Sequence, residues 1–510
     1  MFDTGTLIIH NLEFASNIQS LIINSDIVKG TKDSLDFIFN NFGLEQFNAL
    51  LVNTDLTLDG VVQGNLNIKD LYTSPYFDAE LAIHDWKINN QDIGNANITS
   101  YWDLENKALN INLQSNLERD DKIISPLTAS GYFYPTKDTD NMDFEINFDG
   151  FSLKSLEPFL KSFSSRFEGN LHGAFDIKGN INNPQISGST MVENGVIKID
   201  YTNTSYFFSD SVTIDNQHII LKDFEIKDEK DNVAYIRGDI THSGFKDFNF
   251  DIDLNTDNFL VVNTTQVNEL PFYGTIYATA DVKVTGTDKN INILVESKTN
   301  RNSVLNVPLN DKRTLKEQNF IQFVQREKVV DESYFSNKPK VNDKYLPRIN
   351  YKLSLNIEAT PDIKVNLPMD FSSMKAVVSA TGSGDLRLNV NSDEPFSMMG
   401  DYNINSGTFK VDFMSLLSRE LKIENGSSLN WTGEPANATI NINGVYEKRV
   451  SLSSLTGQKD ALDNISHKSV NVESIISLTG NLSNPKIGFD FRLPNVDQST
   501  EEEVYALIDR

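Results

Sequence analysis

The sequence predicts an all-β protein: a long, curled, mainly antiparallel repeat sheet that forms an elongated apolar groove and carries a few short helices. Two observations predict it. Apolar and polar residues alternate with period two over many segments. A turn phrase also repeats, as Lys-Gly-Asn-Ile-Asn-Asn-Pro-Gln-Ile at 178–186 and Thr-Gly-Asn-Leu-Ser-Asn-Pro-Lys-Ile at 479–487, each time between two alternating segments. A sheet built by repetition is the simplest structure that satisfies both.

The alternation gives each predicted strand one apolar and one polar face. In the clearest case, Phe248, Phe250, Ile252 and Leu254 are separated by polar residues such as Asn249. We expect about 25 strands, nearly all antiparallel because their connections are too short for crossovers. Sixteen apolar residues are the predicted lining of the groove: Phe144, Ile146, Phe148, Phe248, Phe250, Ile252, Leu254, Val282, Val284, Leu353, Leu355, Ile357, Leu386, Leu388, Phe489 and Phe491.

Short glycine-containing phrases between the alternating segments predict tight turns. They are Asn194-Gly195, Gly382-Ser383-Gly384, Ser406-Gly407 and Asn425-Gly426. Glycine and asparagine accept the left-handed backbone conformation that such turns need. We therefore interpret these phrases, and the repeated Gly-Asn-Leu/Ile phrase, as structural punctuation and not as ligand sites.

Helical spacing is confined to a few segments. Residues 33–51 and 151–163 carry apolar side chains at intervals of three and four, which predicts short helical plugs. Residues 301–348 are charged, and one helix is expected near 313–326. Residues 501–508 begin a helix with an acidic first turn that the chain truncates.

These elements divide the chain into four predicted parts. Groove repeats occupy 1–150, with the helical insertion near 33–51, and continue over 151–300. The charged, partly helical insertion covers 301–348. A last groove segment covers 349–510 and ends in the truncated helix.

Composition excludes several classes of function. Lys and Arg total 45 against 71 Asp and Glu, a net charge of -26, which disfavours nucleic-acid binding and adhesion to anionic headgroups. The absence of cysteine excludes disulfides, thiol nucleophiles and thiolate metal sites. The first ten residues lack the pattern of a signal peptide, so we expect either a soluble cytoplasmic chain or a piece of a longer protein.

The motifs of catalysis and cofactor binding are missing. The six histidines are scattered singly, without metal-ligand spacing. The phrases G-x-S-x-G, Walker A and G-x-G-x-x-G do not occur, and Thr381 to Asp385 form a turn candidate with no helix behind it. We therefore predict no enzyme activity, no cofactor and no metal.

The apolar face of so many strands must be covered. Open twisted sheets rarely exceed about ten strands without curling or splitting. Two packed sheets would bury each other's inner faces. A trough too wide for its own side chains would need a long apolar guest, for which acyl chains are the obvious candidates.

Several phrases resemble the TamB family, whose C-terminal domain is related to AsmA-like bridge proteins. They are the run from Gly169 to Ile199, the stretch Asp228 to Ile252, Leu429 to Ala438, and Leu478 to Pro485, with the acidic helix start at 501–508. The resemblance covers 150–510 well and 1–150 as more of the same repeat. The abundant Asn, Asp, Lys and Ile are similar to the variants found in Bacteroidota.

The resemblance implies a groove of the β-taco type in a periplasmic protein that is attached to the inner membrane. It also implies an outer-membrane partner of the TamA or BamA type and no enzyme activity. The family's groove is proposed to carry phospholipid, and its members are described as helping insertion or secretion of outer-membrane proteins. The expected membrane anchor is missing here, as is the sequence expected after Arg510, which fits a piece of a longer chain.

Three functions remain open from the sequence. The first is a lipid conduit, which needs a groove that is apolar from end to end and too wide to be packed. The second is an assembly factor or chaperone for outer-membrane proteins, which needs exposed sheet edges that can pair with client strands. The third is a packed structural β-solenoid, which needs a filled interior.

Overall fold

The computed structural model describes residues 6–16, 18–28, 33–51, 56–70, 76–161, 163–180, 183–243, 246–265, 272–307, 350–371, 374–392, 394–413, 417–451 and 469–508. Their strands belong to one 29-stranded sheet, which confirms the predicted all-β class. The chain divides into two compact units. Unit 1 contains the residues through Leu254 with Thr285–Asp288, and unit 2 contains Asn255–Val284 and the described residues from Lys289 onward.

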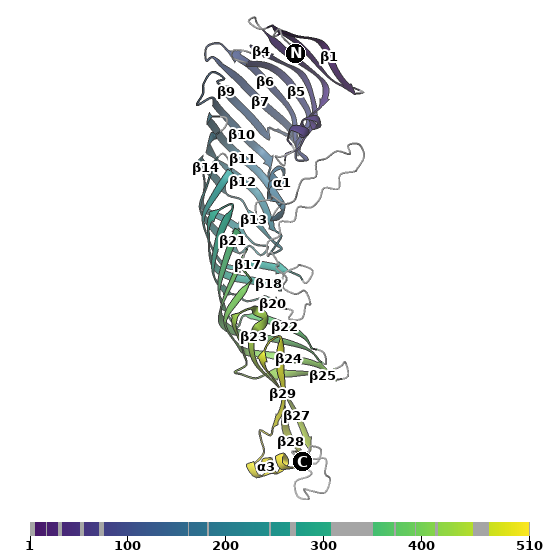
Figure 1. The fold of residues 1–510 in the computed structure, drawn as a ribbon, viewed down its shortest axis with the longest axis vertical. Helices are drawn as coiled ribbons and strands as arrows, with labels where there is room; N and C mark the ends of the chain where they lie inside the picture. Colours follow the sequence, from purple (N-terminus) through teal and green to yellow (C-terminus); the bar gives the residue numbers. More distant parts are fainter. Residues whose placement is uncertain are drawn as a thin grey trace. The chain divides into compact units, whose positions relative to one another are not determined.

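Unit 1 is built from long strands that follow one another in sequence order (Figure 1). Its strands are β1 (Thr6–Ser16), β2 (Gln19–Val28), β3 (Ser34–Gly43), β4 (Leu58–Lys69), β5 (Tyr76–Ile88), β6 (Gln91–Asp103), β7 (Ala108–Arg119), β8 (Lys122–Ile124), β9 (Leu127–Phe133), β10 (Met142–Ser152), β11 (Ser164–Asn180), β12 (Asn183–Ile199), β13 (Thr204–Phe208), β14 (Ser211–Asn216), β15 (His218–Lys227) and β16 (Val233–Ser243). The short helices η1 (Leu44–Leu50), η2 (Leu153–Leu156) and α1 (Glu157–Leu160) interrupt them.

Unit 2 begins within β17 (Lys246–Thr264), after Leu254. Its further strands are β18 (Tyr273–Thr287), β19 (Asn290–Thr299), β20 (Ser303–Asn306), β21 (Asn350–Ala359), β22 (Ile363–Phe371), β23 (Met374–Asn391), β24 (Ser397–Phe413), β25 (Leu417–Ile423), β26 (Ser428–Gly433), β27 (Thr439–Ser451), β28 (Ser469–Asn481) and β29 (Asn484–Arg492). Its described helical segments are η4 (Pro435–Asn437) and α3 (Gln498–Ile508).

The repeated phrase forms hairpin tips, as predicted. Asn180 pairs with Asn183 at the end of β11 and β12, and Asn481 pairs with Asn484 at the end of β28 and β29. Gly179 and Gly480 both have φ of +91°, a conformation that is unfavourable for residues other than glycine. The repeated phrase therefore serves to join two paired strands and does not form a ligand site.

Six strands of unit 1 carry a β-bulge in the described pairings. One extra residue interrupts the pairing in β1, β3, β5, β10, β12 and β15. The residue with positive φ at each of these places is Asn11, Asn41, Asp85, Gly150, Asn194 and Asp223, respectively. We call these six positions the bulge line. Bulges bend and twist the strand that carries them, so the line marks where the sheet of unit 1 changes direction.

Strands of both units also change partner at their bends. β12 pairs with β14 through Ile186–Met191 and with β13 through Gly195–Ile199. In unit 2, β23 pairs with β22 as far as Thr381 and with β21 from Gly384, and β24 changes from β26 to β25 around Asn405. Each such strand therefore contributes to two arms of the sheet.

The sheet is mostly antiparallel, as predicted, and two of the described strand pairs are parallel. β19 pairs with β21 and β20 pairs with β22, both with an offset of 60 residues, as in Asn290 with Asn350. A parallel pair needs a connection of a dozen residues or more. The sequence between β20 and β21 supplies that length.

Residues 34–43 form β3, so the predicted helix over 33–51 is wrong in its first half. Leu35, Phe37 and Phe39 also alternate with period two, and β-branched and aromatic residues favour strands. The bulge at Asn41 then shifts the pattern by one residue, which imitates helical spacing. Only 44–50 is helical, as the 3-10 helix η1.

The other predicted helices have mixed outcomes. The plug at 151–163 is present as two short turns, η2 and α1, after Phe151 and Ser152 complete β10. The helix at 501–508 is confirmed as part of α3, whose Val504 is fully buried against Val472 and Leu493. The helix near 313–326 falls outside the described residues.

Gly444 of β27 lies where the arms of unit 2 pack most closely. A Cβ atom added there would lie 2.7 Å from Cδ1 of the fully buried Phe409 and 3.1 Å from Cβ of Leu421. Replacing Gly444 by Ala should lower the free energy of unfolding by about 1–3 kcal/mol, because an overpacked core must shift. Urea denaturation measures this change.

Gly488 of β29 provides the matched control. Its added Cβ would meet only Cβ of Ser477, at an ordinary distance of 3.6 Å. Gly488→Ala should leave the denaturation midpoint nearly unchanged. Equal effects of the two substitutions would show that the contact with Phe409 is not tight.

Candidate functional site

The two faces of β10 and β17 differ in exposure as the alternation predicts. In β17, the polar residues Asn249, Asp251 and Asp253 are exposed, whereas Phe250 and Ile252 between them are half-buried. In β10, Asp143 and Glu145 are exposed, and the apolar residues between and beyond them are again half-buried. The apolar face is therefore sheltered without being packed.

The same intermediate state holds for nearly all of the predicted groove residues. Fifteen of the sixteen are half-buried: Phe144, Ile146, Phe148, Phe248, Phe250, Ile252 and Leu254 in unit 1, and Val282, Val284, Leu353, Leu355, Ile357, Leu386, Leu388 and Phe491 in unit 2. The sixteenth, Phe489, is 68% exposed. None of them reaches the full burial of a core side chain.

Aromatic rings line part of this sheltered face in unit 1. The rings of Phe248 and Phe250 stack with centroids 6.5 Å apart. Phe148 contacts Phe175 edge-on at 6.0 Å and Phe151 at 5.4 Å. Aromatic side chains thus contact one another on the apolar side of these strands, and Phe148 also packs against a buried cluster.

The first strands of unit 1 are closed by a packed cluster. Ile93 and Ala96 are buried there with Leu44 of η1 and Phe151, next to the start of η2. Asn89 ties the covering segments together, because its Nδ2 donates to the Ser155 carbonyl at 2.7 Å and its Oδ1 accepts from the Thr57 amide at 2.7 Å. Leu44 of η1 is thus part of this cluster, and Asn89 is bonded to Ser155 of η2.

A larger packed cluster closes β22 to β28 in unit 2. Val378, Phe409, Val411, Ile442 and Leu478 are fully buried in it, and the groove residue Leu386 packs against its margin. Phe491 is covered differently, since it contacts Tyr505 of α3 with ring centroids 4.7 Å apart. The interior here is filled by the chain itself, so the groove is not open from end to end.

Tyr402 of β24 belongs to this cluster but carries an unused polar group. The residue is 5% exposed, and its hydroxyl is buried without a hydrogen-bond partner in the described part of the chain. Burial raises the pKa of the Tyr402 hydroxyl to about 12. The phenol therefore remains a neutral donor at physiological pH. The sequence analysis did not single out Tyr402.

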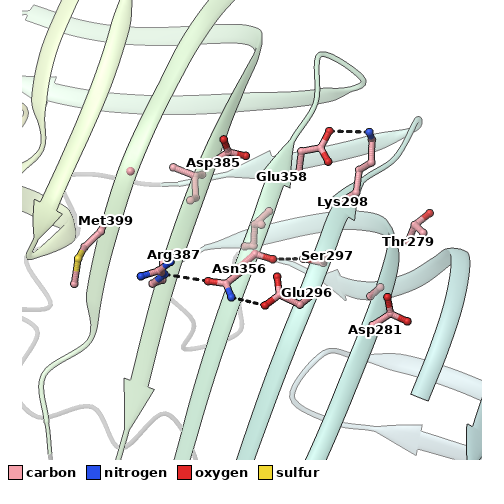
Figure 2. Close-up of a pocket in the computed structure, with 14 residues that line it drawn as sticks. Thr279, Asp281, Glu296, Ser297, Lys298, Asn356, Glu358, Asp385, Arg387 and Met399 are labelled. Atoms are coloured by element: carbon pink, nitrogen blue, oxygen red, sulfur yellow. Dashed lines mark hydrogen bonds and ion pairs between the residues drawn. The ribbon is translucent and has the colours of Figure 1, made fainter. Parts of the chain in front are cut away.

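The polar face of unit 2 holds an open depression of about 770 Å³ across β18, β19, β21, β23 and β24 (Figure 2). Its side chains bond in rows across the strands. Lys298 pairs with Glu358 at 2.7 Å, Asn356 donates to Glu296 at 2.6 Å, and Arg387 donates to Asn356 at 3.1 Å. Lys298 and Arg387 thus bond to other residues of the depression, and these bonds hold the neighbouring strands together.

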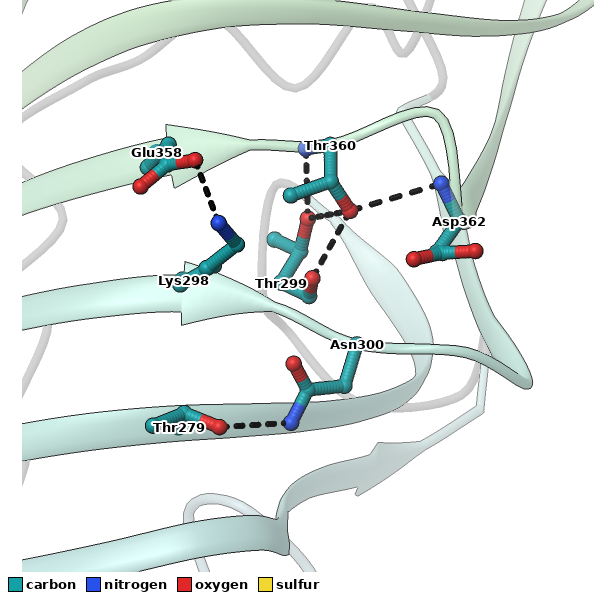
Figure 3. A network of polar contacts seen from close by, with 7 residues as sticks. All are labelled: Thr279, Lys298, Thr299, Asn300, Glu358, Thr360 and Asp362. Atoms are coloured by element: carbon teal, nitrogen blue, oxygen red, sulfur yellow. Dashed lines mark hydrogen bonds and ion pairs between the residues drawn. The ribbon is translucent and has the colours of Figure 1, made fainter.

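Beside this depression, a buried network joins the parallel strands (Figure 3). The Thr360 amide donates to Oγ1 of Thr299 at 2.9 Å, and Oγ1 of Thr360 donates to the Thr299 carbonyl at 2.8 Å. Asn300 reaches β18 through Thr279 at 2.9 Å. These bonds fix the register of the parallel pairing, since both threonines are more than nine-tenths buried.

Among the described residues, no group of His, Asp and Glu is arranged to hold a metal ion. His172 and His218 lie singly in contacts between strands, His172 with Asp149 at 3.2 Å and His218 with Asp239 at 2.6 Å. No helix in this part of the chain is long and apolar enough to cross a membrane.

An all-β sheet with one polar face and one sheltered apolar face defines the structural class of this protein. Comparison with protein families then places it. Residues 14–192 match the TamB N-terminal domain, and residues 222–508 match the TamB C-terminal domain. The chain belongs to the TamB family. No curated protein and no solved structure matches.

Membership of this family supports a TamB-type role in outer-membrane biogenesis. TamB family proteins span the periplasm, are anchored in the inner membrane and associate with TamA. They are not known as enzymes. The N-terminal match extends the family assignment to most of the first 150 residues, which the sequence phrases had covered only as a repeat.

The Tyr402 hydroxyl predicts a stability difference at alkaline pH. Below pH 10 both folded and unfolded chains keep this proton, whereas above pH 10 the unfolded chain loses it first. The free energy of unfolding should therefore fall between pH 10 and 12, and Tyr402→Phe should escape this loss, by about 2 kcal/mol at pH 11.5. Urea denaturation of both proteins at pH 9 and pH 11.5 measures the difference.

Burial also raises the pKa of Tyr206 in unit 1 to about 12. Tyr206 is present in both proteins, so its contribution to the pH dependence cancels in the comparison. The advantage of the Phe variant should widen as the pH rises. Parallel pH profiles would contradict a buried, proton-retaining phenol at position 402.

Proposed function

We propose that this chain is a non-enzymatic periplasmic conduit whose apolar β-groove carries phospholipid acyl chains between the inner and outer membranes. The observation that supports it best is the intermediate burial of the predicted wall residues. A packed interior would bury them fully, and an unsheltered face would expose them. A face of this kind gains about 25 cal/mol per Å² when an apolar guest covers it.

The charge of the chain restricts how lipid would bind. The polar faces of β10 and β17 carry exposed carboxylates such as Glu145 and Asp251, which repel anionic headgroups. Contact would therefore be made through acyl chains on the apolar face, with headgroups at the open side. The packed clusters of both units have no room for acyl chains. Acyl chains would therefore bind only along the strands whose apolar residues are half-buried.

Substitution of one wall residue tests this function. Phe250→Asp places a charge on the half-buried face, and burying an unpaired charge beside acyl chains is costly. The purified protein should then yield several-fold less phospholipid on extraction with organic solvent, measured by mass spectrometry. Its circular dichroism spectrum should stay that of a β-sheet, because Phe250 lies outside the packed clusters.

Asn249→Asp is the matched control. It adds the same charge one residue away, on the exposed face of the same strand. Its phospholipid content should equal that of the wild type. A loss of lipid from the Asn249 variant with none from the Phe250 variant would mean that the faces are reversed, and lipid-free wild-type protein would reject the conduit.

A second candidate function is assembly of outer-membrane proteins with a partner of the TamA or BamA type. Strand β1 favours it, because among the described residues β1 pairs only with β2. Its side chains Ile8, Leu12 and Phe14 are 53%, 43% and 56% exposed. A long apolar edge of this kind is a template for adding another strand.

A photo-crosslinking amino acid at Phe14 tests this candidate. If client strands add to β1, irradiation of the protein in cells should join it to outer-membrane polypeptides. The same group at Asn112, in the interior strand β7, should capture none. Capture of lipid alone at position 14 would count against client assembly at this edge.

A further inference from the structure

Tyr402 marks the point in unit 2 where the half-buried apolar face meets the packed cluster. On one side along β23 and β24 lie Leu388 and Met398, which are paired with each other and half-buried. On the other side lies Ile404, which is 4% exposed. A bound acyl chain that follows the apolar face toward the cluster would therefore end at this tyrosine.

Gly382 lies beneath the ring of Tyr402. A Cβ atom on Gly382 would lie 2.8 Å from both Cε1 and Cζ of the ring, and one on Gly384 would lie 3.0 Å from the Tyr402 Cα. The ring thus packs on a glycine, which explains its position.

Packing does not explain the hydroxyl. A phenylalanine ring would cover the same glycine, and a buried hydroxyl with no partner costs free energy. The surrounding cluster includes apolar side chains such as Ala359, Leu367 and Ala380. A neutral acceptor oxygen is less costly to bury in such surroundings than a charged phosphate.

We propose that the Tyr402 hydroxyl donates a hydrogen bond to an ester carbonyl oxygen of a bound diacyl lipid. This inference rests on the proposed conduit and adds its ligand class: acyl esters, not free hydrocarbon. The hydroxyl would then gain the partner that the described residues do not supply.

Competition between two lipids tests the proposal. Wild-type protein is incubated with equal amounts of diacyl and dialkyl-ether phosphatidylethanolamine of the same chain length, and the retained lipids are quantified after gel filtration. The ether lipid lacks only the carbonyl acceptors. Wild type should retain about threefold to tenfold more of the diacyl lipid, the ratio that one hydrogen bond supports.

Tyr402→Phe should retain the two lipids equally, while its urea midpoint at neutral pH stays at or above that of the wild type. Tyr446→Phe is the control, since this tyrosine packs against the same cluster without a buried unpaired hydroxyl. It should keep the diacyl preference.

A preference retained by Tyr402→Phe, or none in the wild type, would overturn the assignment of Tyr402 while the conduit stands. Failure of the wild type to retain either lipid would overturn both.

Discussion

The sheet of unit 1 depends on what happens to the backbone amides at its bulges. An extra residue in a strand leaves an N–H group without its ladder partner, and such a group needs another acceptor. At three of the bulges, a short polar side chain from a neighbouring segment accepts this bond. The Asn11 amide bonds Oδ1 of Asn24 at 2.7 Å, the Asp85 amide bonds Oδ1 of Asn95 at 3.1 Å, and the Asn194 amide bonds Oγ of Ser209 at 3.0 Å.

This device links composition to function. Asparagine and aspartate adopt positive φ at small cost, and they also offer a side-chain acceptor at short range. Their abundance lets strand after strand bend without losing backbone hydrogen bonds. A strand that bends in this way shelters its apolar side without filling the space beside it, which is the property that the proposed function uses.

The periodicity of the sequence predicted the fold class and the two faces of the strands. Phe250 and Asn249 fall on the sheltered and exposed sides as expected. Local phrases were less reliable. Asn194-Gly195, Gly382-Ser383-Gly384 and Ser406-Gly407 resemble hairpin turns and instead lie inside β12, β23 and β24. Glycine and asparagine serve both purposes, and only pairing with neighbouring strands decides between them.

Other features lay beyond the reach of sequence patterns. The interior of unit 2 is packed where Phe409 meets Gly444, a contact between β24 and β27 that no periodicity encodes. The unpaired hydroxyl of Tyr402 depends on what surrounds it in three dimensions. Inward-facing residues can thus be identified from alternation, but whether they are covered by the chain or left for a guest requires the structure.

The parallel pairing of β19 with β21 has a consequence for how the chain folds. Its partners are 60 residues apart, whereas hairpins such as β28 with β29 close over a few residues. Closing the longer loop costs about 1.6 kcal/mol more than closing one of ten residues. We therefore expect the hairpins on either side to form early. Pairing of β19 with β21, including the bonds between Thr299 and Thr360, should be the slow, late step of folding in unit 2.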